Sequence, residues 1–203
     1  MRCPDPLARA RARQEATIAT RSPLRILGLD PGSRATGYGV LDREGDELRW
    51  VAHGVLRPRP GTLASRLGAL AGELSAVLEQ HRPDVASVED VFVSVSPRSA
   101  LVLGQARGAA LACLGAAGLP LAEYPPARIK QAVSGSGRAP KAQVQRMVRR
   151  LLELERLPPT DAADALAAAI CHAHAGPLEG LARPRRRGSR SRAGWSQRVR
   201  RAP

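Results

Sequence analysis

The stretch Arg25-Ile-Leu-Gly-Leu-Asp30, followed by Pro-Gly, is a short apolar run that ends in turn-forming residues. This pattern predicts a buried β-strand that stops at Asp30. Two further strand-like runs follow over 36–42 and 48–56, and Glu44-Gly-Asp46 between them predicts a tight hairpin. The segment therefore predicts three antiparallel strands in sequence, with a carboxylate at the end of the first.

Downstream of these strands, helical and strand patterns alternate. Apolar residues recur with helical spacing from Leu63 to His81, and Pro83 follows. We expect strands over 85–92 and 119–123, and helices over 99–115, 125–134, 140–154 and 160–174. The order βββαβαβααα predicts an α/β fold, a mixed five-stranded sheet with helices on both faces.

The charge is unevenly distributed along the chain. Of the formal net charge of +14, a large part lies in residues 180–203, which hold nine Arg and no acid. We expect a disordered basic N-terminal extension over 1–24, one folded domain over 25–175 and a disordered Arg-rich tail over 176–203. Within the folded part, residues 98–150 carry nine basic residues and one acid, Glu123. This local excess indicates a polyanionic partner such as nucleic acid.

Composition argues against several other classes of protein. Cys3, Cys113 and Cys171 are far apart and odd in number, so neither a disulfide framework nor a zinc site is expected. The chain has no continuous run of about 18 apolar residues, so no membrane span is expected. The N-terminus holds Arg residues without a following apolar stretch, unlike a secretory signal.

Four acidic residues stand out by context. Asp30 and Glu89 end two strands that we expect to be neighbours, while Asp161 and Asp164 share one face of the last helix. Carboxylates that converge repel one another, so such a cluster needs protons or cations. Hard divalent ions prefer oxygen ligands, which favours Mg²⁺, with Mn²⁺ as a substitute. Two such ions about 3.5–4 Å apart can activate a water and stabilise the leaving oxygen of a phosphodiester.

Each acid also has a simpler interpretation. Asp161 favours a helix N-terminus, Asp30 suits a turn before Pro-Gly, and Glu89 at a strand end suits an exposed position. A metal site at Cys171, His172 and His174 is disfavoured, because residues i and i+2 point to different sides of a helix. The specificity of the acidic pattern therefore comes from the combination.

The combination resembles the RuvC family of crossover junction endodeoxyribonucleases. The resemblance covers about residues 25–175 and is carried by six blocks in the family's order. The blocks are LGLDPGSRATGYGV (27–40), VEDVF (88–92), SALVLGQARG (99–108), EYPPARIKQ (123–131), KAQVQ (141–145) and DAADALA (161–167).

The resemblance implies an RNase H-like nuclease domain and a homodimer. It also implies Mg²⁺-dependent, symmetric nicking of two like-polarity strands of a four-way junction, with two ions per site. The products would carry 5′-phosphate and 3′-hydroxyl ends. The implied setting is recombinational DNA repair in the bacterial cytoplasm, with the RuvA and RuvB branch-migration proteins as partners.

The resemblance also assigns residues. The family's four acidic positions fall on Asp30, Glu89, Asp161 and Asp164. Its two DNA-contacting lysines fall on Lys130 and Lys141, and the aromatic that presses on bases at the junction centre falls on Phe92.

The chain departs from the family pattern around Phe92. Val95, Ser96 and Val102 stand where polar or basic residues are familiar, so Arg98 is our alternative DNA contact in this loop. Asp90 stands where a neutral Gln or another acid is familiar. We expect Asp90 outside the metal site, because successive strand residues point to opposite faces.

Three other functions remain as alternatives. An ATPase of the actin-like fold shares a related strand core, but it needs two facing domains and this chain has room for one. A non-enzymatic DNA-binding protein would use the tails, so deleting 177–203 would abolish its activity, whereas a nuclease would still cleave. A related RNase H-like nuclease acting on RNA is the nearest competitor.

Overall fold

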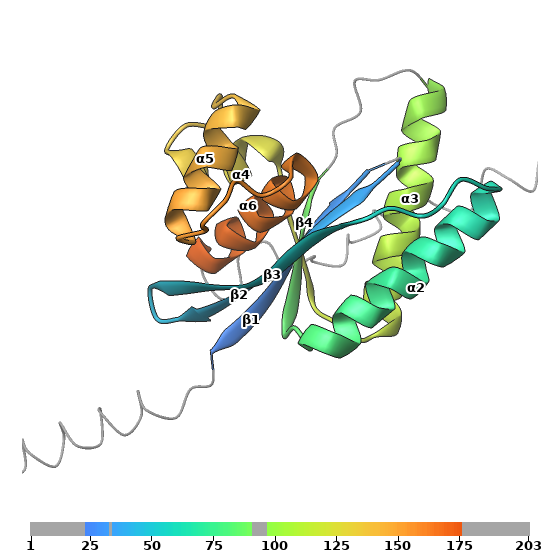
Figure 1. Cartoon of the computed structure of the whole chain (residues 1–203), viewed down its shortest axis with the longest axis horizontal. Helices are drawn as coiled ribbons and strands as arrows, with labels where there is room; N and C mark the ends of the chain where they lie inside the picture. The colour runs from blue at the N-terminus through green and yellow to red at the C-terminus, as the bar shows by residue number, and fades with distance from the viewer. Residues whose placement is uncertain (1–22, 33, 91–96, 176–203) are drawn as a thin grey trace, which may run out of the picture.

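The computed structural model describes residues 23–32, 34–90 and 97–175 (Figure 1). The predicted Arg-rich tail and almost all of the predicted N-terminal extension lie outside these ranges, as does Phe92. The strands are β1 (Leu24–Pro31), β2 (Thr36–Glu44), β3 (Glu47–Leu56), β4 (Val85–Glu89) and β5 (Leu121–Tyr124). The helices, labelled from α2 onward, are α2 (Leu63–His81), α3 (Pro97–Ala116), α4 (Pro126–Ser134), α5 (Lys141–Leu151) and α6 (Thr160–His174).

The five strands form one mixed sheet in the order β3-β2-β1-β4-β5. The β1–β2 and β2–β3 pairs are antiparallel, and Gly45, with φ of 62°, begins the tight turn between β2 and β3. The β1–β4 and β4–β5 pairs are parallel, and α3 is the helical crossover that joins β4 to β5. The predicted fold and the predicted β1–β4 neighbourhood are therefore confirmed.

Helices cover both faces of the sheet (Figure 1). Helices α4, α5 and α6 lie on one side, and α2 and α3 lie on the other. The first layer packs around Ile26, Leu166 and Ile170, and the second packs around Leu27, Leu29 and Leu74. Side chains of β1 alternate between the two layers, as the pleat of a strand requires, and the strand is buried from both sides.

Element boundaries differ from the sequence-based expectation in several places, among them β4, which was expected over 85–92 and ends at Glu89. The strand expected at 119–123 runs from Leu121 to Tyr124, and the helix expected at 140–154 ends at Leu151. The helix stops early because Glu153 has a φ of 50°, in the left-handed region that a right-handed helix cannot include.

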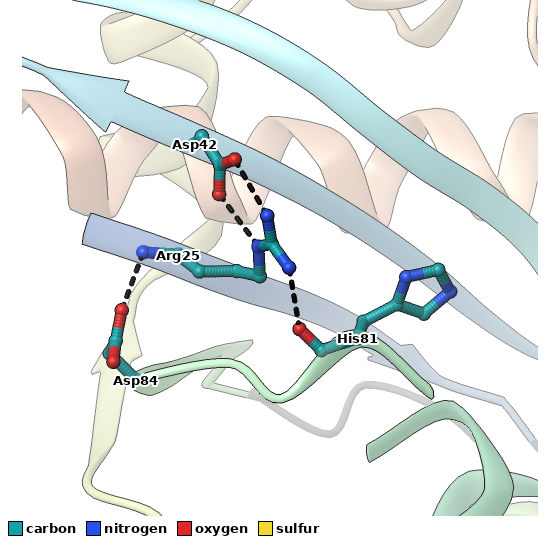
Figure 2. A network of polar contacts seen from close by, with 4 residues as sticks. All are labelled: Arg25, Asp42, His81 and Asp84. Atoms are coloured by element: carbon teal, nitrogen blue, oxygen red, sulfur yellow. Dashed lines mark hydrogen bonds and ion pairs between the residues drawn. The ribbon is translucent and has the colours of Figure 1, made fainter. Parts of the chain in front are cut away.

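Arg25 anchors the first strand to its surroundings (Figure 2). Its guanidinium donates two hydrogen bonds of 2.8 Å to the carboxylate of Asp42 on β2 and one of 3.0 Å to the carbonyl of His81 at the end of α2. Its backbone N–H donates to the carboxylate of Asp84, just before β4, at 2.7 Å. These contacts join the start of β1 to the segments on both sides, while Asp30 lies near the opposite end of the strand.

Helix α6 lies unusually close to the sheet. A Cβ on Gly28 of β1 would collide with the backbone carbonyl of Ala165, and a Cβ on Gly37 of β2 would collide with the carbonyl of Asp161. The facing side of α6 is mostly alanine and is fully buried. Small residues on both elements therefore allow the helix backbone to rest on the strands and determine where its N-terminus lies.

Within the described residues, one stretch passes a test for a membrane span by length and composition. It is Ser99–Ala116 of α3, with mean hydropathy 1.3 and 17% of the stretch buried. The stretch is interrupted by Gln105 and Arg107, so it is not a continuous apolar run. One such helix is weak evidence for a membrane protein, and α3 packs against α2 and β1.

Candidate active site

The carboxyl-terminal ends of β1 and β4 bring Asp30 and Glu89 to the same edge of the sheet. The two strands are parallel, with Leu29 in register with Val88, so the residues that follow them are also neighbours. On its other side Asp30 pairs with Gly37 of β2. The sheet therefore places one acid from each of two central strands side by side.

Helix α6 adds Asp161 and Asp164 to this edge. Its N-terminus is held by the close contact between Gly37 and the backbone of Asp161. Further along the helix, the buried hydroxyl of Ser87 on β4 donates a 2.8 Å hydrogen bond to the carbonyl of Ala168. Sheet and helix are thus joined by backbone contacts that set the position of both aspartates.

The pKa values of the strand acids show that the carboxylates interact. Burial, followed by the charges of Asp164, Glu89 and Asp161, raises the pKa of Asp30 to about 7, against the opposing effect of Lys141. Burial and the charge of Asp164 also raise the pKa of Glu89. The cluster therefore holds more negative charge than its surroundings neutralise, which is the condition under which carboxylates recruit cations.

Lys141 supplies part of the missing positive charge. Its ammonium donates a 2.9 Å hydrogen bond to Asp164, and Asp164, Asp30 and Glu89 all contribute to raising its pKa above the ordinary lysine value. Lys130 lies beside the same acids. Both lysines line a cavity of ≈ 100 Å³ together with Glu89 and Asp164, and the charge of Lys130 opposes the rise in the pKa of Glu89. The two predicted DNA-contacting lysines therefore border the acidic cluster.

Asp161 lies at the rim of the cluster. Its side chain is 40% exposed, against 18% for Asp164, and it pairs with the exposed Arg57 at 3.9 Å. Its charge is the weakest of the three acidic influences on Asp30. Asp161 is therefore more accessible than Asp164, its neighbour on the same helix face.

The donor set suits a hard divalent cation. All four candidate ligands are carboxylates, and Mg²⁺ prefers oxygen ligands. In the conformation of the structure, however, no three His, Cys, Asp or Glu side chains among the described residues form a ready-made ligand set. Since Lys141 already pairs with Asp164, cation binding would require that side chain and the carboxylates to rearrange.

The remaining residues singled out in the sequence belong to the segment that follows β4. Phe92, Val95 and Ser96 lie outside the described residues, and Arg98 belongs to α3 with a side chain that is not described. Asp90 is exposed, and its backbone N–H donates to the carbonyl of Tyr124 at 2.8 Å. The assignment of Phe92 and Arg98 to DNA binding stays a prediction.

His172 is buried in the fold and hydrogen-bonded to a neighbouring strand. It is 7% exposed, and its Nδ1 lies 2.8 Å from the hydroxyl of Tyr124 on β5. His174 is exposed, so the two histidines of α6 face different surroundings, as their spacing predicts. Burial, and secondarily the charge of Arg43, lowers the pKa of His172 below its ordinary value of 6.5.

This depressed pKa predicts acid sensitivity of the fold. As pH falls below about 6.5, the unfolded chain takes up a proton at His172 that the folded protein resists, so the free energy of unfolding falls by up to about 1.4 kcal/mol per pH unit. Above that pH the residue is neutral in both states and contributes no pH dependence. Urea unfolding of the parent and of His172→Gln between pH 8 and pH 5 should show a shallower decline for the variant.

His174→Gln is the matched control for this prediction, because it removes an exposed histidine from the same helix. Its pH dependence should follow that of the parent. Identical pH slopes for the parent and His172→Gln would contradict the assignment.

Two contributors to the site were not identified from sequence. Ser87 fixes α6 through a buried hydrogen bond, and Arg107 of α3 binds the backbone carbonyl of Glu89 at 2.6 Å. Arg107 could have been recognised from the sequence, because it is the single charged residue in its helix apart from Arg98 and stands among mostly apolar and small residues. Ser87 carried none, because a small polar residue in a strand has many ordinary roles.

Taken together, the five-stranded mixed sheet and its flanking helices define an RNase H-like fold, with four acids gathered at the ends of β1 and β4 and at the start of α6. The fold of the yeast mitochondrial Holliday junction resolvase Ydc2 is similar, with a TM-score of 0.57, 16% identity and coverage of 77% of this chain and 81% of that one.

Sequence comparison identifies the family. The sequence model of crossover junction endodeoxyribonuclease RuvC matches residues 26–172. The RuvC proteins of Burkholderia multivorans and Burkholderia vietnamiensis are 55% and 56% identical over 153 residues, which is 75% of this chain and 85% of theirs. The chain belongs to the RuvC family, whose members are metal-dependent nucleases.

A solved structure of a RuvC protein is similar in fold to this chain. Thermus thermophilus RuvC in complex with a Holliday junction substrate has a TM-score of 0.70 and 35% identity, with coverage of 74% of this chain and 93% of that one.

Proposed function

We propose that this crossover junction endodeoxyribonuclease resolves Holliday junctions with the carboxylate cluster of Asp30, Glu89, Asp161 and Asp164. It nicks two strands of like polarity symmetrically and leaves 5′-phosphate and 3′-hydroxyl ends that can be ligated. The observation that carries the proposal is the convergence of these acids, with Lys130 and Lys141 beside them, in a chain of the RuvC family.

Mg²⁺ is the proposed cofactor, at two ions per site, with Mn²⁺ as a substitute. Asp30, Glu89 and Asp164 would hold it together with the rim residue Asp161. When bound, the metal lowers the pKa of a water molecule for attack on phosphorus and stabilises the leaving oxygen. The raised pKa values of Asp30 and Glu89 support this assignment, because cations relieve the repulsion that raises them.

The chain's own basic residues would position the DNA. The Lys141 side chain is 70% exposed and flexible, so its ammonium is accessible to a phosphate as well as to Asp164. Lys130 borders the same cavity. Contacts of this kind fix the register of the substrate without reading its bases.

A second copy of the chain is the proposed partner for α3. The helix is apolar but mostly uncovered, with Leu101 64% exposed, and a Cβ at Gly104 or Gly108 would meet nothing within 4 Å. Beside it, an open hollow of ≈ 590 Å³ between α2 and α3 is lined largely by apolar residues. A two-fold dimer through this face would present two identical sites to the two-fold symmetry of a junction.

Leu101→Asp tests the dimer. A charge in the middle of an apolar interface should shift the protein to monomers in analytical ultracentrifugation. It should also replace paired nicks by single nicks on a cruciform plasmid. A variant that remains dimeric and makes paired nicks would contradict the α3 interface.

Phe92 is proposed as the residue that presses on bases at the junction centre. Phe92→Ala should retain junction binding in a gel-shift assay while cleavage falls by about 10-fold or more, because stacking on a base contributes about 1–3 kcal/mol. Unchanged cleavage would remove this role from Phe92. Arg98, which follows Phe92 in the sequence, is proposed as a further DNA contact.

The cellular setting is proposed to be recombinational repair in the bacterial cytoplasm, together with the RuvA and RuvB proteins. The decisive test of substrate is a nuclease assay on a four-way junction, a linear duplex and a structured RNA, with and without Mg²⁺. Metal-dependent cleavage restricted to the junction supports the proposal. Preferred cleavage of RNA would overturn it in favour of an RNA-directed nuclease of the same fold.

A further inference from the structure

Arg107 joins three elements next to the acidic cluster. It extends from α3, on the sheet face opposite α6, and its side chain is only 14% exposed. Its Nη1 donates a 2.6 Å hydrogen bond to the backbone carbonyl of Glu89, the last residue of β4. Its Nη2 forms an ion pair with the carboxylate of Glu123 on β5.

The contact lies where β4 ends. On one side, Glu89 is in register with Tyr124 of β5, and the N–H of Asp90 donates to the Tyr124 carbonyl. On the other side, the Glu89 carbonyl accepts from Arg107. The backbone that carries the Glu89 carboxylate is thus held both by the sheet and by a side chain from α3.

Glu123 makes this arrangement stable. A largely buried guanidinium without a counter-ion would be strongly destabilising, and the Glu123 carboxylate supplies the compensating charge. Because a guanidinium is a rigid planar fork, fixing Nη2 on Glu123 also fixes the direction of Nη1 toward Glu89. An ammonium has no such fork, so lysine would not reproduce both contacts in the same geometry.

We propose that Arg107, oriented by Glu123, is a positioning residue that holds the Glu89 backbone so that its carboxylate is set beside Asp30 and Asp164 for cation binding. The inference rests on the proposed role of Glu89 as a metal ligand. It differs from a purely structural role, in which Arg107 would join α3 to the sheet and affect only the free energy of unfolding.

Metal affinity of the folded, DNA-free protein distinguishes the two roles. Mn²⁺ binding is measured by the electron paramagnetic resonance signal of the free ion, using the full chain as parent, Arg107→Lys and Arg107→Gln. Loss of an outer contact that orients a ligand typically weakens metal binding by about 10–100-fold, and Arg107→Gln should fall in that range. Arg107→Lys should weaken binding less, and junction binding without metal should be unchanged in both.

Arg150→Gln is the matched control, because it removes an exposed arginine from the end of α5. It should bind Mn²⁺ like the parent. Arg107→Gln that is folded by circular dichroism and binds Mn²⁺ like the parent would overturn the proposal, even if its unfolding temperature were lower.

Two further variants keep the test conclusive. If Arg107→Gln does not fold, Glu123→Ala is measured instead, because this substitution removes the carboxylate that orients the guanidinium of Arg107. Unchanged Mn²⁺ affinity in Glu123→Ala would overturn the proposal. Asp30→Asn separates the two levels of inference. Parent-like Mn²⁺ binding in Asp30→Asn would refute the metal site itself, whereas lost binding there with no effect of Arg107→Gln would refute only the positioning role.

Discussion

Asp30→Asn should eliminate strand cleavage while leaving junction binding intact. The substitution keeps the size of the side chain but removes the central charge of the cluster, on which Asp164, Glu89 and Asp161 all act. Loss of an outer-shell partner already costs about 10–100-fold in metal enzymes, so loss of a ligand should cost more than about 100-fold. Single-turnover cleavage of a labelled four-way junction measures the rate, and a gel-shift assay without metal measures binding.

The same variant should be more stable than the parent when metal is absent. Burial and three neighbouring acids disfavour the charged form of Asp30, so a neutral amide relieves repulsion in the folded state. Thermal unfolding at pH 8 in a chelator should therefore show a higher midpoint for Asp30→Asn. This second readout separates loss of the metal site from loss of the fold.

Asp90→Asn is the control for Asp30→Asn. Asp90 follows Glu89 directly but is exposed, so removing its charge should leave cleavage close to the parent rate. Full cleavage by Asp30→Asn would refute the carboxylate site, and loss of cleavage in Asp90→Asn would show that the acid assignment is incomplete.

Gly37→Ala should inactivate the enzyme by moving α6. An added Cβ would overlap the carbonyl of Asp161 and approach the backbone nitrogen of Ala162, and neither is a flexible side chain that can turn away. The N-terminus of α6 must shift, which carries Asp161 and Asp164 with it. Overpacking of this kind costs about 1–3 kcal/mol of stability, and a displacement of about 1 Å at a reacting centre can cost about 100-fold in rate.

Gly68→Ala is the matched control for Gly37→Ala. The same methyl group on the exposed side of α2 meets nothing within 4 Å, and alanine favours a helix by about 1 kcal/mol over glycine. Cleavage should be unchanged, and urea unfolding should show equal or greater stability. Parent-like cleavage by Gly37→Ala would show that α6 does not need this close approach.

Much of the fold could be predicted from local pattern. The hairpin at Gly45, the limits of α2 and α6 and the order of elements follow from turn residues and apolar periodicity, which act over a few neighbouring residues. The neighbourhood of β1 and β4 was expected from the order of the elements, and it is confirmed. Boundaries near Pro120 and Glu153 were less accurate, because they depend on the backbone conformation of single residues.

The acids could also be found in the sequence, but their interaction could not. Asp30 and Glu89 stand at strand ends, and Asp161 and Asp164 share a helix face; the family resemblance selected the same four residues. That burial and mutual repulsion raise the pKa of Asp30 to about 7 depends on how closely α6 rests on the sheet. The pairing of Lys141 with Asp164 rather than with solvent likewise depends on where α5 begins relative to α6.

By itself, the sequence determined the types and order of the elements and the chemistry available at their ends, because both depend on residues close together in the chain. The tertiary structure alone decided that Gly28 and Gly37 bring α6 against the strands, that Ser87 secures it and that Arg107 reaches the Glu89 carbonyl. These contacts join residues far apart in the chain, and their short distances come from the packing of whole elements, which no local pattern encodes.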